Sequence, residues 1–132
     1  MSKKYTSQVK SLEYLRNIMN RLNYVENKSH PVMVGNNLLN CGGILAKVNL
    51  RNFTFEERSD VMGLITVLMG LDFACFSSVK SFSYAIKDAL KIASNMSLKY
   101  EESNKKLFRL VTPVAYILNY SDSYINSIVK NS

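Results

Sequence analysis

The sequence predicts an all-α protein, a single compact bundle of five to seven helices around a central apolar helix at about residues 60–76. Apolar residues recur at three- and four-residue spacing along most of the chain, and no convincing strand pattern appears. The stretch Val61–Phe76 carries one charge, Asp72, so it lacks the polar stripe that a solvated helix needs. Hydrophobic residues make up 47% of 132 residues, which excludes a disordered chain and indicates one domain, residues 1–132.

The central stretch is the element around which we expect the others to pack. We expect Val61–Phe76 to be buried on nearly all sides and to end near Ser77 and Ser78. Gly63 and Gly70 are seven residues apart and therefore lie near one face of this helix. A neighbouring helix is expected to approach closely there.

Two helices are predicted before it. Residues 5–23 place apolar side chains on one face, and Lys10, Tyr14 and Arg21 lie on the opposite one. Pro31 suits the first position of a second helix at about 31–47, because its missing N–H costs nothing there. The pair Gly42-Gly43 weakens this helix and favours a break or a tight crossing.

The later helices carry clearer signals. Thr54 and Glu57 form a capping box at the start of the central helix. Residues 78–97 form an amphipathic helix with a regular apolar seam of Phe82, Ile86, Ala89, Ala93 and Met96. Another helix covers 101–111, and Pro113 then kinks it or starts a new helix capped by Thr112. Three tyrosines recur along this last segment, as a base-stacking ladder or as the rim of the core: Tyr116, Tyr120 and Tyr124.

Charge supplies the main functional signal. Seventeen lysines and arginines against ten acids give a net charge of +7, which favours polyanionic partners. Lys80, Tyr84, Lys87 and Lys91 fall on one face of the 78–97 helix, with only Asp88 nearby. Cations can neutralise phosphates and a tyrosine can stack on a base. The other interpretation is a solvated lysine face with Tyr84 covering a neighbour. The predicted nucleic-acid-binding residues are Lys80, Tyr84, Lys87, Lys91, Lys10, Tyr14 and Arg21.

No catalytic or metal-binding pattern appears. The single histidine, His30, stands in a polar loop, and a metal site needs more ligands than the chain offers. Cys41 and Cys75 lie in apolar surroundings, and we expect both to be buried free thiols. The first ten residues lack the apolar run of a signal peptide, and Val61–Phe76 is short for a membrane span. We therefore expect a cytoplasmic protein that is not an enzyme, binds no cofactor and contacts no membrane.

Two regions resemble the small all-helical subunit of type III-B CRISPR effector complexes. They are the Pro-led entry Pro31-Val32-Met33-Val34 with Asn36-Asn37-Leu38-Leu39 and Leu45-Ala46-Lys47, and the segment Ile117-Leu118-Asn119-Tyr120 followed by Tyr124. The resemblance implies a non-catalytic subunit that stacks with its own kind and contacts the backbone of guide RNA and its target.

This sequence departs from that family at three points. Asn37-Leu38 stands where Asn-Gly-Leu is expected, with a short deletion after it, and Tyr120 replaces a usual tryptophan. Ser121-Asp122-Ser123 replaces a usual basic pair, so a nucleic-acid role is not carried over to that helix.

A second resemblance is to the poxviral relatives of the Bcl apoptosis regulators. Tyr100-Glu101-Glu102-Ser103 with Leu107-Phe108-Arg109 is similar to the penultimate helix of those proteins. It implies a bundle that seats a partner's amphipathic helix in a groove, or whose helical face blocks innate-immune adaptors. The net charge of +7 is unusual for that group, and Asn40-Cys41-Gly42-Gly43 lacks its groove arginine.

The sequence thus favours a non-catalytic subunit of a ribonucleoprotein complex that binds nucleic-acid backbones. Its expected partners are RNA or single-stranded DNA and other subunits, which include copies of itself. The alternative is a viral Bcl-like interaction module that binds a partner helix or adaptor to block apoptosis or innate immune signalling. A third interpretation is a bundle that binds an acidic protein.

Overall fold

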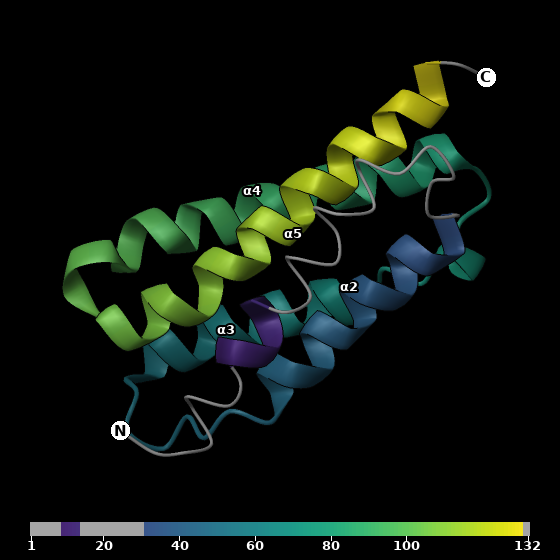
Figure 1. The fold of residues 1–132 in the computed structure, drawn as a ribbon. Coiled ribbons are helices and arrows are strands. Elements are labelled where there is room, and N and C mark those ends of the chain that lie inside the picture. Colours follow the sequence, from purple (N-terminus) through teal and green to yellow (C-terminus); the bar gives the residue numbers. More distant parts are fainter. Residues whose placement is uncertain (1–8, 14–30, 131–132) are drawn as a thin grey trace.

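A computed structural model describes residues 9–13 and 31–130, and within these ranges the chain is helical and contains no strand. The elements are α2 (Pro31–Ala46), α3 (Phe55–Met69), the 3-10 helix η1 (Phe73–Cys75), α4 (Val79–Ser103) and α5 (Lys105–Lys130). α4 packs chiefly on α5, and α2 packs on α3, so the helices form two layers (Figure 1). The predicted all-α bundle is confirmed for this part of the chain.

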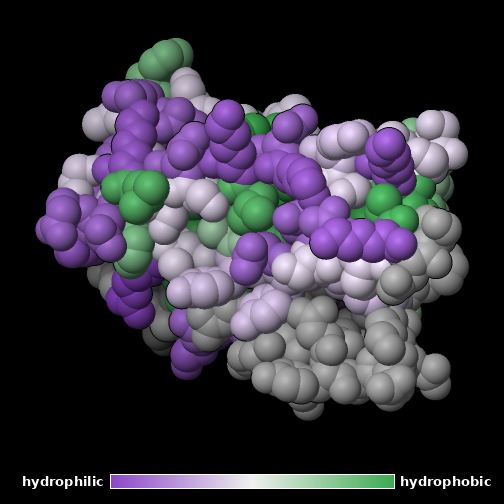
Figure 2. All heavy atoms as spheres, turned by 90° about the horizontal axis from the view of Figure 1, so that it is seen from above, coloured by the Kyte–Doolittle hydropathy of each residue, from purple (hydrophilic) through white to green (hydrophobic). Residues whose placement is uncertain are grey.

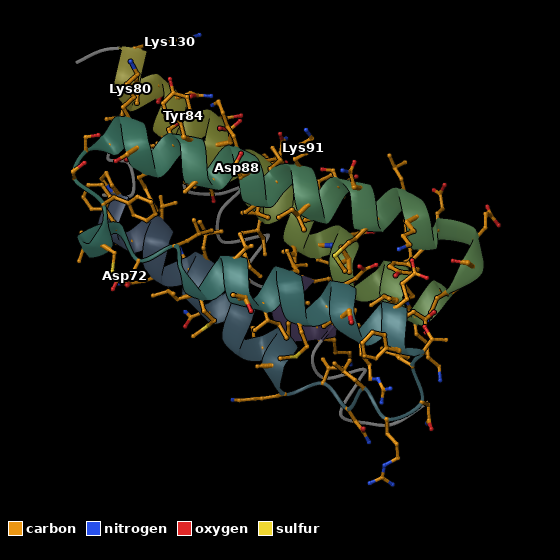
Figure 3. The ribbon with its side chains drawn as sticks, turned by 180° about the vertical axis from the view of Figure 1, so that it is seen from behind. Asp72, Lys80, Tyr84, Asp88, Lys91 and Lys130 are labelled. Atoms are coloured by element: carbon orange, nitrogen blue, oxygen red, sulfur yellow. The ribbon has the colours of Figure 1, made fainter. Side chains whose placement is uncertain are left out.

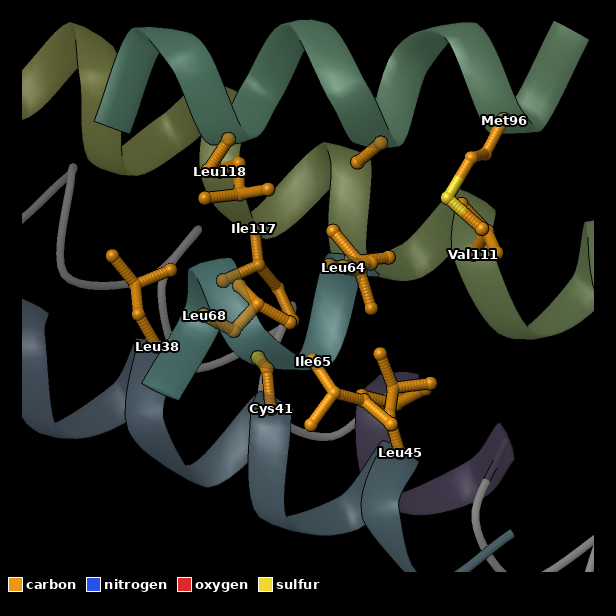
Figure 4. Packing of buried hydrophobic residues seen from close by; sticks show 14 of the residues in the cluster. Leu38, Cys41, Leu45, Leu64, Ile65, Leu68, Met96, Val111, Ile117 and Leu118 are labelled. Carbon is orange, nitrogen blue, oxygen red and sulfur yellow. The ribbon is translucent and has the colours of Figure 1, made fainter. Parts of the chain in front are cut away.

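The core lies between the two layers. Leu64 and Leu68 of α3, Cys41 of α2 and Ile117 of α5 are all fully buried and point into the same space (Figure 4). Each leucine removed from water in this way contributes about 1.5–3 kcal/mol to folding. The predicted seam of the 78–97 helix is confirmed, because every one of its five members is buried in the core.

α4 and α5 are antiparallel, and three polar contacts define their register. Ser83 Oγ lies 3.1 Å from Asn126 Oδ1, Lys87 Nζ lies 2.7 Å from Asp122 Oδ1, and the hydroxyls of Ser97 and Thr112 are 2.8 Å apart. As residue numbers rise along α4, those of the partners on α5 fall by the same steps. The two helices therefore stay side by side over most of their length.

The close approach between α2 and α3 occurs at Gly42, where a tight crossing was one of the two predicted outcomes, and not at Gly63 or Gly70. A Cβ at Gly42 would come within 2.8 Å of Met69 Sδ, and one at Gly35 would come within 2.9 Å of the Leu71 carbonyl oxygen. A Cβ at Gly63 would meet nothing within 4 Å, and Gly70 contacts only its own helix, which it ends. The prediction of close packing at Gly63 and Gly70 is wrong, since both are exposed on the outer side of α3.

The predicted central helix is shorter and more exposed than expected. α3 starts at the predicted capping box of Thr54 and Glu57, but it ends at Met69 instead of near Ser77. Its buried side consists of Val61, Leu64, Ile65 and Leu68. Only one side of α3 faces the core of this two-layer bundle, so burial on nearly all sides was a wrong prediction.

The last two helices are longer than predicted. α4 continues to Ser103, and α5 passes through Pro113 without interruption. A proline inside a helix costs about 3 kcal/mol because it removes a hydrogen bond and clashes with the preceding turn. Residues on both sides of Pro113, including Leu110 and Ile117, are fully buried, and their packing keeps the helix continuous. Thr112 is thus a residue within the helix and not a cap.

The two cysteines differ in their burial. Cys41 is buried, and this burial raises the pKa of its thiol to about 12. Cys75 is exposed in η1, so the prediction of two buried thiols is wrong for Cys75. Among the described residues, no helix has the length and apolar character that crossing a membrane requires.

Candidate interaction surfaces

Three surface features stand out among the described residues. Within 9–13 and 31–130, no group of three or more His, Cys, Asp or Glu side chains is arranged to hold a metal ion. His30 lies outside the described residues. The features that remain are a cationic surface on α4, a groove between α4 and α5, and the outer side of α3.

The structure places three of the predicted residues on the outer surface of α4. Lys80, Tyr84 and Lys91 are exposed there, and Asp88 lies between Tyr84 and Lys91 (Figure 3). The tyrosine is 58% exposed, so much of its ring faces solvent. α4 begins just before Lys80 with a capping box of Ser78 and Ser81, and the positive end of its helix dipole therefore adds to the charge of Lys80.

Lys87 is less available to a ligand than Lys80 and Lys91, because residues of α5 engage its ammonium. Its ammonium donates to Asp122 Oδ1 and to Asn126 Oδ1, each at 2.7 Å, and lies 3.4 Å from Ser83 Oγ. These partners tie α4 to α5, so Lys87 is part of the contact between the helices. Asp122 is the acid that stands where the CRISPR resemblance expects a basic pair.

The structure adds one cation that sequence reasoning missed. Lys130, near the end of α5, lies at the same end of the bundle as Lys80 (Figure 3). Only the antiparallel register of α4 and α5 brings these two residues together. We call the surface formed by Lys80, Tyr84, Lys91 and Lys130 the cationic surface.

The remaining predicted site residues belong to the N-terminal region. Lys10 is exposed in the helical segment 9–13, which agrees with its predicted place on a solvated face. Tyr14 and Arg21 lie outside the described residues. Whether any of the seven binds nucleic acid stays a prediction.

A groove of about 370 Å³ runs between α4 and α5. Leu98, which is 74% exposed, and Tyr116, which is 49% exposed, stand at its sides. Seen from above, hydrophobic surface shows between hydrophilic side chains over these helices (Figure 2). The lining comes from four residues of each helix: Leu90, Ser94, Ser97 and Leu98, and Thr112, Ala115, Tyr116 and Asn119. We call this the α4–α5 groove.

The three tyrosines of α5 do not form one ladder. Tyr116 lines the groove, whereas Tyr120 and Tyr124 are half-buried and pack against the core. This burial raises the pKa of Tyr124. Tyr120 and Tyr124 are therefore rim residues, which was one of the two predicted interpretations.

A row of exposed apolar side chains runs along α3. Phe55, Met62 and Met69 are 79%, 53% and 50% exposed and follow one another at seven-residue spacing. Two turns of an α-helix take about seven residues, so the three side chains form one stripe along α3. We call it the α3 stripe.

An ionic cluster joins α3 to α4. Lys99 Nζ donates to Glu56 at 2.5 Å and to Asp60 at 2.9 Å, and the Tyr100 hydroxyl also donates to Asp60. Burial alone would raise the pKa of Asp60, but the bonds from Tyr100 and Lys99 bring it below its ordinary value. Burial and the bond to Asp60 raise the pKa of Tyr100 to about 12. Every member of the cluster is engaged within it, so its role is to hold α4 against α3.

Comparison with known proteins identifies no relative. A scan against protein-family models and searches of curated proteins and of solved structures gave no match to this chain.

Proposed function

We propose that this protein is a non-catalytic binding module that seats an amphipathic helix of a partner protein in the α4–α5 groove. The observation that carries the proposal is the groove itself, which has an exposed leucine and an exposed tyrosine at its sides. Leu98 is the most exposed leucine among the residues that the structure describes. Solvated leucines of this kind mark interaction sites when they stand beside a concave surface.

The shape and chemistry of the groove suit a helix. Two long helices form its walls, and an amphipathic helix presents apolar residues at three- and four-residue spacing to such a groove. Leu90, Leu98 and Ala115 offer the apolar contacts. The hydroxyls of Ser97 and Thr112 share one hydrogen bond, which leaves one of the two O–H groups to donate to a backbone carbonyl or to the ligand.

The resemblance to the poxviral relatives of the Bcl regulators supports the same mode of binding. It rests on Tyr100–Ser103 and Leu107–Arg109, which stand at the turn between the two walls of the groove. On that resemblance, the partner would be a regulator of apoptosis or an innate-immune adaptor.

The test is affinity capture on the immobilised protein, from lysates with and without nuclease, followed by binding of synthetic helical peptides from the captured protein. We expect capture to resist nuclease and Leu98→Glu to weaken peptide binding roughly tenfold or more, because it puts a charge into the apolar contact. Met33→Glu, at a half-exposed methionine of α2, is the matched control. Equal binding by Leu98→Glu and wild type contradicts the proposal.

A second candidate function is binding of nucleic-acid backbones, and the cationic surface favours it. Within the described residues, Lys80, Lys91 and Lys130 form no ion pair. Such lysines act through phosphate neutralisation, so binding of single-stranded RNA must weaken as salt rises. In this proposal the protein is a backbone-contacting subunit of a ribonucleoprotein complex, as the CRISPR resemblance implies.

Charge reversal separates this candidate from the first. We expect the triple variant Lys80→Glu, Lys91→Glu and Lys130→Glu to abolish RNA binding and to leave capture of a protein partner intact. Arg51→Glu, at an exposed arginine distant from the cationic surface in sequence, serves as the control. RNA binding that persists in the triple variant, with the salt dependence of the wild type, contradicts the second candidate.

A further inference from the structure

We propose that the α3 stripe is a self-association surface, at which two copies of this chain pair with antiparallel α3 helices about a two-fold axis at Met62. This inference uses a different surface from the α4–α5 groove and does not rest on the proposed function.

The outer side of α3 is free of charge in its second half, whereas the exposed Arg58 lies beside the stripe in its first half. No residue from Val61 to Leu71 is ionisable. The Thr66 hydroxyl donates to the Met62 carbonyl at 2.8 Å, so it is satisfied within the helix. In the view from behind, none of the described helices lies in front of α3 (Figure 3), and Met69, at the end of the stripe, also borders Gly42 of α2. A row of three large apolar side chains, each at least half exposed, is unusual on a solvated surface.

The spacing of the stripe permits antiparallel self-pairing. Phe55 and Met69 lie seven residues on either side of Met62, so the three positions are evenly spaced, with a phenylalanine at one end and a methionine at the other. An antiparallel second copy therefore places each Phe55 against a Met69 and the two Met62 side chains against each other. Symmetric dimers need a patch of this kind, because one surface must fit itself. Gly63, beside Met62, is exposed, and a Cβ there would meet nothing within 4 Å, so a second backbone has space to approach closely.

Charges at the two ends of α3 favour the antiparallel arrangement. Arg51 and Arg58 are exposed near its N-terminal end, and Asp72 follows its C-terminal end. The acid Glu56 at the N-terminal end is already paired with Lys99. With the axis at Met62, antiparallel pairing sets Arg51 of one copy near Asp72 of the other, places Arg58 opposite Thr66 and opposes the two helix dipoles, whereas parallel pairing sets like charges together.

The size of the surface predicts a weak dimer. α3 has 15 residues and is about 22 Å long, so one helix pair buries less than the roughly 1,200 Å² of a standard stable interface. We therefore expect a dissociation constant on the order of micromolar or weaker. Dimers should appear in sedimentation velocity as the protein concentration rises.

Disulfide trapping tests the proposed geometry. In a Cys75→Ser background, Met62→Cys is expected to give covalent dimers on mild oxidation, because the axis brings position 62 against itself. Phe55→Cys and Met69→Cys chains are expected to cross-link when mixed and much less when oxidised alone. Leu98→Cys, at a more exposed position on α4, is the control for random collision.

A charge at the axis gives an independent test. Met62→Asp sets two carboxylates against each other, and we expect it to weaken dimerisation about a hundredfold. Met33→Asp is the matched control and should leave dimerisation unchanged. A wild-type protein that remains monomeric at millimolar concentration, or Met62→Cys chains that cross-link no faster than Leu98→Cys chains, would overturn the proposal. Binding of a different protein to α3 in a monomeric chain would overturn it as well.

Discussion

Asn104 Nδ2 donates to Glu57 Oε2 at 2.9 Å, so the residue between α4 and α5 holds the acid that caps α3. Glu57 Oε1 accepts from the Thr54 backbone at 2.8 Å, and Asn104 Oδ1 accepts from the Leu107 backbone at 3.1 Å. The starts of α3 and α5 are thus joined by one pair of side chains. This pair links the two layers at one end of the bundle.

Loss of this link is expected to destabilise the protein. Asn104→Ala removes the cap of α5 and one bond to Glu57, and we expect it to lower the free energy of unfolding by about 1–2 kcal/mol. Urea unfolding of Asn104→Ala, Glu57→Ala and the double variant measures the coupling. Because the two side chains act together, the double variant should lose less than the sum of the single losses. Strict additivity would contradict the link.

Acid should weaken the contact between α3 and α4. The bond from Asn104 lowers the pKa of Glu57 below its ordinary 4.5, and Asp60 also has a pKa below its ordinary 3.8. Their contribution to stability is complete above these ordinary values and is lost as pH falls through the lower pKa values of the folded state. Urea unfolding between pH 2 and pH 6 measures this loss. We expect the Asp60→Asn variant to lose less stability at acid pH than the wild type, because only the contribution of Glu57 remains. A loss as large as that of the wild type would contradict the role of Asp60.

Alkaline pH should destabilise the protein by ionising Tyr100. Its pKa is raised from 10.0 to about 12, so its contribution is complete below pH 10 and is lost as pH rises through about 12. Tyr100→Phe removes the ionisable group, and we expect its stability to change less with pH than that of the wild type above pH 10. Tyr84→Phe, at an exposed tyrosine, is the control and should behave as the wild type does. Equal pH dependence in all three proteins would contradict the role of Tyr100.

Two glycines of α2 should respond in opposite directions to alanine. A Cβ at Gly35 would come within 3.0 Å of backbone atoms of Leu71 and Phe73, so we expect Gly35→Ala to cost about 1–3 kcal/mol. A Cβ at Gly43 would meet nothing within 4 Å, and Gly43→Ala should stabilise the helix by about 1 kcal/mol. Thermal unfolding of both variants checks the sign of each change, and a shift in the same direction for both would contradict this prediction.

Substitution of Lys87 and of Lys91 should change the stability by different amounts, although both residues were predicted to belong to one cationic face. Lys87→Ala removes an ion pair and leaves Asp122 and Asn126 without their shared donor, so we expect a loss of about 1 kcal/mol. Lys91→Ala removes no such ion pair or shared hydrogen bond, and it should change stability by less than about 0.5 kcal/mol. Chemical denaturation of the two variants makes the comparison, and equal losses would contradict it.

Local sequence patterns determined much of this protein. The helical spacing of apolar residues predicted the helices that begin near residues 31, 55 and 79, and the capping box of Thr54 and Glu57 located the start of α3. The exposed positions of Lys80, Tyr84 and Lys91 also followed from helical periodicity. These features depend on residues within a few turns of one another, so the sequence of a single segment is enough to predict them.

Tertiary packing decided the rest. It kept α5 continuous through Pro113, because buried residues on both sides offset the cost of the proline. It left one side of α3 uncovered, because a two-layer bundle has only one core for that helix to face. It also paired Lys87 with Asp122 and brought Lys130 beside Lys80, since both depend on the register between two helices. Periodicity shows which residues share a face of a helix, but only the packed fold shows what that face meets.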